Sequence, residues 1–309
     1  MEVITGILAT AVLAGGVLAL AALGEVLSER VGVFNLGVEG LMALGGVTGI
    51  IAGTLIPNAF LGLLAALIVG LAFGAVFALA TVVFRANQVL CGLALTMLGT
   101  GLAATIGRSY SGMPAKAVFE RVVVPYLSDL PIIGRAFFSQ NILVYPIYIL
   151  LPAAIYFILF RARHGLNVRS VGENPAAADA AGVPVTLIRF CYVTMGAALG
   201  AGAGAYLTLA FVTSWSEGVV AGRGWIAVAL VIFAGYRPFS AVLGALLFGV
   251  ITAFGFVGQA RNWPITPAFL SMLPYLGTLA FMIVPVIVWG RQRRAAPAAL
   301  GVPYFRDER

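Results

Sequence analysis

Long stretches without an ionisable side chain constrain the fold of this chain more than any other feature. Most are about as long as the roughly 20 helical residues that cross the ~30 Å hydrocarbon core of a bilayer. The eight charge-free runs are 3–24, 40–84, 86–107, 136–160, 190–216, 224–236, 238–260 and 262–290. Only 9% of the residues are charged, against roughly 25% in soluble domains. The sequence therefore predicts an all-α, multi-pass protein of the cell membrane.

Two of these runs do not match a single crossing. The run 40–84 is too long for one helix and carries the turn signal Pro57-Asn58 near its middle, so we divide it into two segments. The run 224–236 is too short for a full crossing, which indicates a short or broken helix. About nine membrane segments (eight to ten) are expected, in a single transmembrane domain over residues 1–290 followed by a cytoplasmic tail over 291–309.

Positive residues in the connections predict the orientation, because Arg and Lys are enriched on the cytoplasmic side. If the loop 161–189 lies inside, alternation places 12 of the 18 positive residues in the cytoplasm. The inside set is Arg30, Arg85, Arg161, Arg163, Arg169, Arg189, Arg237, Arg291, Arg293, Arg294, Arg306 and Arg309. The outside set is Arg108, Lys116, Arg121, Arg135, Arg223 and Arg261. The N-terminus is thus predicted outside and the C-terminus inside.

The order of the segments suggests an inverted repeat with broken helices. Run 3–24 leads through the charged, glycine-bearing stretch 24–40 into two further spans, and run 190–216 leads through 216–224 into the short segment and two spans. On the predicted topology the first half starts from outside and the second from inside. Transporters with this arrangement bind their solutes near the broken helices.

Glu39 is the polar residue that most needs an explanation, because a carboxylate at membrane depth costs a few kcal/mol. If a helix begins near Asn35, then Asn35 and Glu39 lie on one face and could present an amide and a carboxylate to a solute. Alternatively, Glu39 caps backbone amides at a helix start and fixes the shape of the break. Glu217 and Trp225, with Arg223, pose the same choice in the second half, whereas Glu25, Glu29 and Arg30 are expected to form a charged cytoplasmic rim.

The sequence contains no ATPase site of its own. A P-loop requires a lysine between a glycine and Ser or Thr, yet the only lysine, Lys116, follows Ala115. No nucleophile with a base, and no cluster of metal ligands, accompanies His164, Cys91 or Cys191, so we expect neither an enzyme, nor a metal site, nor a cofactor bound by this chain. The net charge of +7 is explained by cytoplasmic flanks and does not indicate nucleic-acid binding.

The stretch HGLNVRSVGENPAAADAAGV (164–183) is a polar element in an apolar chain. Asn174 is a suitable N-cap, Pro175 suits the first helical position, and Gly182 with Pro184 ends the helix. A helix of about two turns is predicted over residues 174–182, on the cytoplasmic face. It is either an ordinary capped loop helix or a rigid projection that docks into a groove of another protein.

Four stretches together resemble the permease subunits of bacterial ABC importers for nucleosides and simple sugars, which are related to the ribose and branched-chain amino acid permeases. They are GEVLSERVGVFNLGVEGLMALGG (24–46), NQVLCGLALTMLGTGL (87–102), RHGLNVRSVGENPAAADAAGV (163–183) and GRGWIAVALVIFAGYRPFSAVLGALLFG (222–249). The pattern SERxGVxNxGxEG is typical of the nucleoside branch. The pattern GENPxAAxxAG resembles the cytoplasmic coupling loop of the wider family, which spans residues 161–189 here.

The resemblance implies a permease subunit that translocates nucleosides, or simple sugars, without hydrolysing ATP itself. The implied partners are a cytoplasmic ABC ATPase that binds the ATP, a second and non-identical permease, an extracytoplasmic solute-binding lipoprotein and the lipid bilayer, with no nucleic acid. The candidate residues for ATPase coupling are Gly172, Glu173, Asn174, Pro175, Ala177, Ala178 and Gly182. The candidate residues for the substrate pathway are Phe34, Asn35, Glu39, Glu217 and Trp225.

The alternative is a secondary transporter of a small polar solute, driven by an ion gradient. An inverted repeat and the intramembrane carboxylate of Glu39 also suit that class, because a buried carboxylate can carry a proton. The coupling pattern favours the importer, since a gradient-driven carrier has no need of it.

Overall fold

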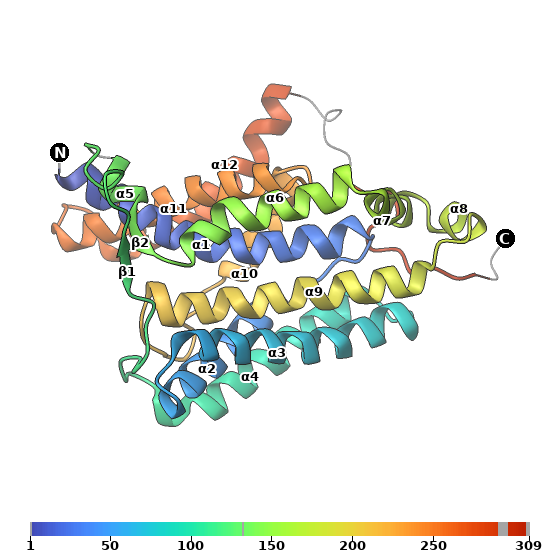
Figure 1. The fold of residues 1–309 in the computed structure, drawn as a ribbon, viewed down its shortest axis with the longest axis horizontal. Coiled ribbons are helices and arrows are strands. Elements are labelled where there is room, and N and C mark those ends of the chain that lie inside the picture. Colours follow the sequence, from blue (N-terminus) through green and yellow to red (C-terminus); the bar gives the residue numbers. More distant parts are fainter. Residues whose placement is uncertain (1, 132, 290–295, 307–309) are drawn as a thin grey trace.

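The computed structural model describes residues 2–131, 133–289 and 296–306, which are mostly helical (Figure 1). The helices are α1 (Glu2–Arg30), α2 (Val38–Leu55), α3 (Ala59–Ala78), α4 (Gln88–Gly107), α5 (Ile133–Phe137), α6 (Leu151–Tyr156), α7 (Arg163–Glu173), α8 (Pro175–Ala180), α9 (Val185–Tyr206), α10 (Arg223–Phe233), α11 (Pro238–Ala260) and α12 (Pro267–Trp289). Strands β1 (Arg121–Val123) and β2 (Ser139–Asn141) pair antiparallel, with Arg121 opposite Asn141. Arg291, Arg293, Arg294 and Arg309 lie outside the described residues.

Short segments of wider, π-helical turns lengthen several of these helices. Leu79–Val83 continues α3, Leu207–Phe211 continues α9, and Pro146–Leu150 and Phe157–Arg161 flank α6. Where the chain turns, asparagine side chains begin the next helix. Asn58 accepts hydrogen bonds from the amides of Phe60 and Leu61, and Asn87 accepts one from Leu90. The turn predicted at Pro57-Asn58 is thereby explained.

Each of the nine predicted membrane segments corresponds to helical structure, of which fewer than nine qualify as crossings by length and composition. Among the described residues six helices are long and apolar enough to cross a bilayer: α1, α2, α3 with its extension, α4, α9 and α11. The segment Pro146–Arg161 bends by 78° into α7, and counting this pair as one span gives up to seven. The run 224–236 contains only the shorter apolar helix Arg223–Phe233, whereas α12 covers Pro267–Trp289 of the run 262–290. The expected count of nine is therefore not confirmed.

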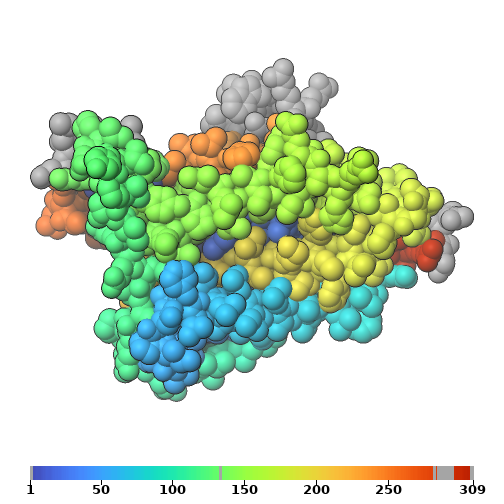
Figure 2. Space-filling view, viewed as in Figure 1, coloured from blue at the N-terminus to red at the C-terminus, as the bar shows by residue number. Residues whose placement is uncertain are grey.

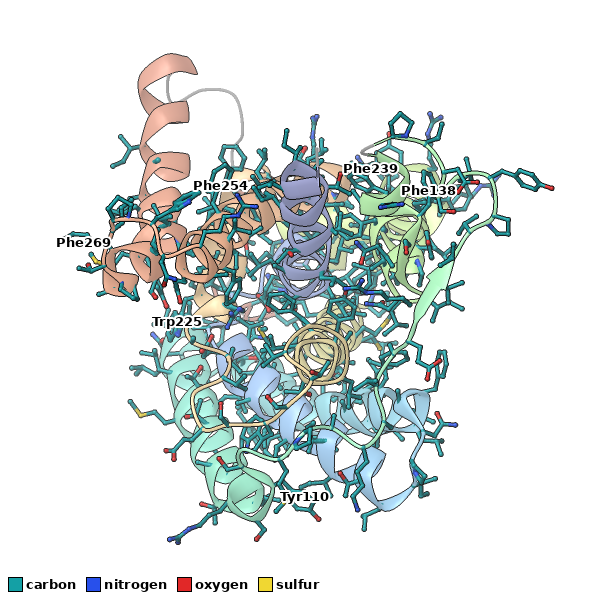
Figure 3. The ribbon with its side chains drawn as sticks, turned by 90° about the vertical axis from the view of Figure 1, so that its left-hand side faces the viewer. Tyr110, Phe138, Trp225, Phe239, Phe254 and Phe269 are labelled. Atoms are coloured by element: carbon teal, nitrogen blue, oxygen red, sulfur yellow. The ribbon has the colours of Figure 1, made fainter. Side chains whose placement is uncertain are left out.

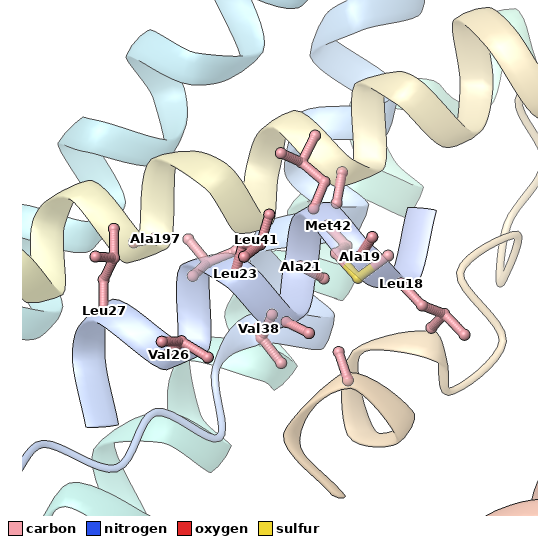
Figure 4. Close-up of a cluster of buried hydrophobic side chains, with 14 of the residues drawn as sticks. Leu18, Ala19, Ala21, Leu23, Val26, Leu27, Val38, Leu41, Met42 and Ala197 are labelled. Carbon is pink, nitrogen blue, oxygen red and sulfur yellow. The ribbon is translucent and has the colours of Figure 1, made fainter. Parts of the chain in front are cut away.

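The core is built around two long helices, α1 and α9, which lie side by side. α1 packs most extensively on α11 and α9, while α9 packs on α3, α1 and α2. Figure 4 shows Leu23 and Leu27 of α1, Leu41 of α2 and Ala197 of α9 in this interior. Glycines permit the close approach of these helices. On α2, for example, a Cβ at Gly45 would collide with the backbone of Ala201 on α9. Small residues at helix contacts are expected inside a membrane, where tight packing replaces the hydrophobic effect.

The connections gather at two opposite ends of the molecule. One end carries the N-terminus, α5 and both strands, and the other carries α7, α8 and the residues before the C-terminus (Figures 1 and 2). At the first end the loop after α4 pairs with the loop after α9, where the amide of Gly112 donates to the carbonyl of Trp215 at 2.9 Å. This grouping agrees with the sequence-based expectation that successive connections alternate between the two sides of the membrane. Which end faces the cytoplasm stays a prediction.

The charged rim expected at Glu25, Glu29 and Arg30 is wrong for the two carboxylates. α1 continues to Arg30, well beyond its charge-free run, and both glutamates have no exposed surface. They are enclosed because Gly24, one residue before Glu25, lies against the backbone of Gly196 on α9. Arg30 instead donates to the carbonyl of Tyr236 at 2.8 Å and holds the end of α1 against the chain that follows α10.

Candidate functional site

Glu39 joins the two broken regions of the chain. It lies in the first turn of α2, and its carboxylate contacts the start of α10. Oε1 accepts a hydrogen bond from the amide of Gly222 at 2.8 Å, and Oε2 accepts one from the amide of Gly224 at 2.7 Å. Only 8% of Glu39 is exposed. The capping interpretation is thus correct in kind, but the capped helix is α10, far away in sequence.

The start of α10 is shaped to receive this carboxylate. Gly222 has a left-handed backbone (φ +75°), which turns its amide toward Glu39, and a Cβ at Gly224 would lie 2.6 Å from the Glu39 backbone. The unpaired amides and the positive end of the helix dipole both favour a carboxylate there. Tyr275 of α12 donates to the carbonyl of Ala221 at 2.6 Å and supports the turn from the other side.

Asn35 does not share a helix face with Glu39, because α2 begins after Gly37 and leaves Asn35 in the extended connection. The Asn35 side chain accepts from the amide of Gly37 at 2.9 Å and donates to Glu25 at 3.3 Å. It is fully buried. The expected amide and carboxylate pair on one face is therefore not formed, and Asn35 supports the bend between α1 and α2.

Residues of α4 hold the same connection in place. Gln88 accepts from the amide of Phe34 at 2.7 Å, and Thr96 donates to the carbonyl of Leu36 at 2.8 Å. Phe34 is consequently half-buried against the core. These polar side chains were not singled out by sequence reasoning, although both lie in the stretch 87–102 that carries the family resemblance.

A cavity of about 420 Å³ lies beside Glu39 and brings it together with Glu217. Its walls are α2, α4 and the loop before α10, and they include Met97, Thr100 and Trp215. Glu217 is exposed in this loop, and Trp215 is buried beneath it. Each carboxylate oxygen can accept more than one hydrogen bond, so the cavity could bind a small solute that carries hydroxyl or amino groups. Trp215 was missed because no pattern in the sequence separates it from Trp225.

Trp225 does not line this cavity. It is 39% exposed and lies toward the edge of the molecule in the end view of Figure 3. Arg223 contributes instead to a second cavity of about 260 Å³ with Tyr275, on the α11 and α12 side of α10. Of the five candidate pathway residues, the structure brings Glu39 and Glu217 together in one cavity, whereas Phe34, Asn35 and Trp225 lie outside its lining.

The predicted short helix is present as α8. Asn174 accepts from the amide of Ala177 at 2.9 Å, Pro175 occupies the first turn, and the left-handed Gly182 (φ +80°) follows the helix end. The amide of Val183 donates to the carbonyl of Ala178 at 3.0 Å and closes the end. The preceding residues 163–173 form a second helix, α7, that sequence reasoning did not predict.

The candidate coupling residues lie on two sides of this element. Glu173, Asn174, Ala177 and Gly182 are exposed, and Pro175 is partly exposed. Ala178 is only 3% exposed, and Gly172 is buried against the carbonyl of Arg30. The exposed set could face another protein, whereas Gly172 and Ala178 fix the element to the rest of the chain.

Comparison with known proteins adds a full-length similarity. A family model described as the branched-chain amino acid transport system / permease component matches residues 7–285. The chain is 38% identical to a putative glucose ABC transporter permease protein, TsgC13, from Haloferax volcanii, over 99% of each chain. It is 33% identical to the nucleoside permease NupC of Lactococcus lactis (93% and 92% of the two chains) and 33% identical to the guanosine permease NupQ of Bacillus subtilis (94% of each). No solved structure matches the chain.

Proposed function

The chain belongs to the family of branched-chain amino acid transport system permease components, and from that membership we propose that it translocates nucleosides or simple sugars as the permease subunit of an ATP-driven importer. The observation that carries the proposal is similarity over nearly the whole chain to permeases named for glucose, nucleosides and guanosine. The cavity beside Glu39 supports it, because two carboxylates suit solutes rich in hydroxyl and amino groups.

The translocation unit is an inverted repeat in which α1–α4 correspond to α9–α12. The packing supports this pairing, since α1 lies against α11 just as α9 lies against α3. α2 and α10 begin directly after the broken regions of the two halves, and their first turns meet at Glu39. Repeats of this kind place the solute site where broken helices converge. The N-terminus and the strands then lie outside, and α7 with α8 lies in the cytoplasm.

Transport requires partners that supply the energy and the solute. A cytoplasmic ABC ATPase binds ATP and docks on the exposed side of α8, where Ala177 allows a close approach. A second permease and an extracytoplasmic solute-binding protein complete the importer. ATP binding performs work on the permease only if the ATPase binds the two permease states with different affinities.

The alternative of a secondary transporter rests on Glu39 as a proton carrier. Both oxygens of Glu39 accept backbone hydrogen bonds at the start of α10, which fits a fixed carboxylate better than one that repeatedly gains and loses a proton. We therefore retain the ATP-driven importer.

Uptake of labelled solutes tests the proposed substrate class. Cells expressing the chain with its partner subunits should take up radiolabelled guanosine, uridine or glucose faster than cells in which this chain alone is deleted. Leucine uptake should be equal in the two strains. Stimulation of leucine uptake, with none of nucleosides or sugars, would contradict the proposal.

A further inference from the structure

Residues 296–306 lie across the end of the molecule that carries α7 and α8, although they follow α12 in sequence. We call this segment the tail strap. Two backbone hydrogen bonds attach it to different elements. The amide of Ala299 donates to the carbonyl of Gly172 in α7 at 2.9 Å, and the amide of Gly301 donates to the carbonyl of Gly32, just after α1, at 3.2 Å.

The tail strap also binds α8 through side chains. Tyr304 donates its hydroxyl hydrogen to Asp179 Oδ2 at 3.1 Å, and Arg306 Nε lies 3.1 Å from the same oxygen. The Arg306 side chain is 74% exposed, so its ion pair alone is weak. The Asp179 side chain is only 19% exposed, which favours the contact with Tyr304. Asp179 is thus the point at which α8 contacts the tail strap.

Further contacts extend the tail strap to α9 and to the turn after α3. Arg189 of α9 is 3% exposed and donates to the carbonyl of Val302 at 3.2 Å. Arg85 lies over the ring of Phe305, 4.9 Å from its centre. Because no single contact is strong, the tail strap holds its position through the whole set.

These contacts link α8 to the end of α1 by two routes. Gly172, at the end of α7, packs directly on the carbonyl of Arg30 and leaves no space for a side chain. The tail strap reaches Asp179 on one side and Gly32 on the other. Gly32 lies near the start of the connection 31–37, which leads to the first turn of α2, where Glu39 holds α10. A displacement of α8 would therefore reach the Glu39 contact through bonded and packed groups.

We propose that the tail strap transmits the movement of α8 to the cytoplasmic end of α1 and so couples ATP hydrolysis to the opening of the cavity beside Glu39. This role rests on the proposed function, because it needs an ATPase that moves α8. The tail strap is a positioning segment that does not touch the solute. Its loss should uncouple hydrolysis from transport, and the docking of the ATPase should persist.

Deletion of residues 296–309 from the intact importer tests this role in proteoliposomes. The ATPase should still co-purify and hydrolyse ATP, while the solute transported per ATP falls at least about fivefold, a typical allosteric coupling. An unchanged ratio would overturn the proposal, and so would loss of ATPase co-purification, which would make the tail strap a docking element. The full-length importer is the reference, since failure of its ATP-dependent uptake would refute the proposed function instead.

A tethering experiment keeps the proposal testable if the deletion variant does not fold. Asp179→Cys and Tyr304→Cys are combined in a chain that also carries Cys91→Ala and Cys191→Ala. Without a link this variant lacks the Asp179 contact, so transport per ATP should be low. A short thiol-specific cross-linker should restore it. A link that fails to restore coupling would refute the role. A link that abolishes uptake would also refute it, by showing that the tail strap must detach during transport.

Discussion

At the scale of single residues, Glu39 is the side chain that joins the first turn of α2 to the start of α10. Its two oxygens accept hydrogen bonds from the backbone amides of Gly222 and Gly224, so one side chain helps to fix the first turn of α10. Hydrogen bonds to a charged acceptor contribute about 1.5–3 kcal/mol each. Glutamine at this position retains one acceptor oxygen and directs an amide group at the other backbone donor.

Glu39→Gln should therefore lower uptake at least about tenfold, as expected when a contact worth ~1.4 kcal/mol is lost in one transport state. Expression and ATPase co-purification should be unchanged, because Glu39 is remote from α8. Initial uptake rates in membranes with matched protein amounts provide the measurement.

Glu217→Gln is the matched control, since Glu217 lines the same cavity but is exposed. It should reduce apparent solute affinity without altering the packing of α10. If both substitutions lower solute affinity equally and neither changes anything else, Glu39 contacts the solute and its contact with α10 is not needed for transport.

The residues also show how far sequence reasoning extends. Asn174 and Gly182 were identified correctly because caps depend on neighbours a few positions away. The capped partner of Glu39 could not be identified, since Gly222 is distant in sequence. Glu25 and Glu29 were misplaced because a charge was equated with a helix end, whereas α1 continues past both.

At the scale of elements, α8 has an inner and an outer face. Ala178 packs inward with 3% exposure, whereas Ala177 is exposed. A two-turn helix has few residues, so neighbouring alanines have opposite roles. The sequence predicted the helix but not its faces, because an alanine-rich turn has no apolar periodicity from which a buried side can be inferred.

Arginine substitutions on the two faces of α8 should have different effects. Ala177→Arg should leave expression normal but weaken ATPase co-purification by about a hundredfold, because a bulky cation enters a packed contact between proteins. Ala178→Arg should instead destabilise the permease itself, since the charge is forced into its own interior. Thermal aggregation of the purified permease and its affinity for the ATPase measure the two effects.

Ala177→Ser provides a control of nearly unchanged size and should retain ATPase binding. If Ala177→Arg binds the ATPase as well as the parent chain does, α8 is only a capped loop helix.

Helix lengths were predicted less well than helix positions. Charge-free runs locate apolar segments, but they do not reveal the π-helical turns around α6 or the 78° bend into α7. α10 was correctly expected to be short, because its run has too few residues for a crossing. The long helix expected in the run 262–290 is present, because α12 covers Pro267–Trp289.

At the scale of the whole molecule, the connections separate between two ends, as the orientation predicted from the positive residues requires. The strands and α5 lie at one end, and α7, α8 and the tail strap lie at the other (Figure 1). Asp129 and Ala181 are exposed residues at these opposite ends.

Cysteine labelling tests that orientation directly. In a chain with Cys91→Ala and Cys191→Ala, expressed without partners, Asp129→Cys should react with a membrane-impermeant thiol reagent added to intact cells. Ala181→Cys should react only after the cells are opened. The reverse pattern would invert the topology and place α8 outside, where no cytoplasmic ATPase could reach it.

The energy source of transport tests the central claim most directly. The importer is reconstituted in proteoliposomes with its ATPase and its solute-binding protein on the appropriate sides, and uptake of labelled guanosine or glucose is measured. The account predicts accumulation that requires ATP, persists when a proton ionophore collapses the pH gradient, and is lost when this chain is omitted. Uptake that proceeds without ATP and follows an imposed proton gradient would contradict it.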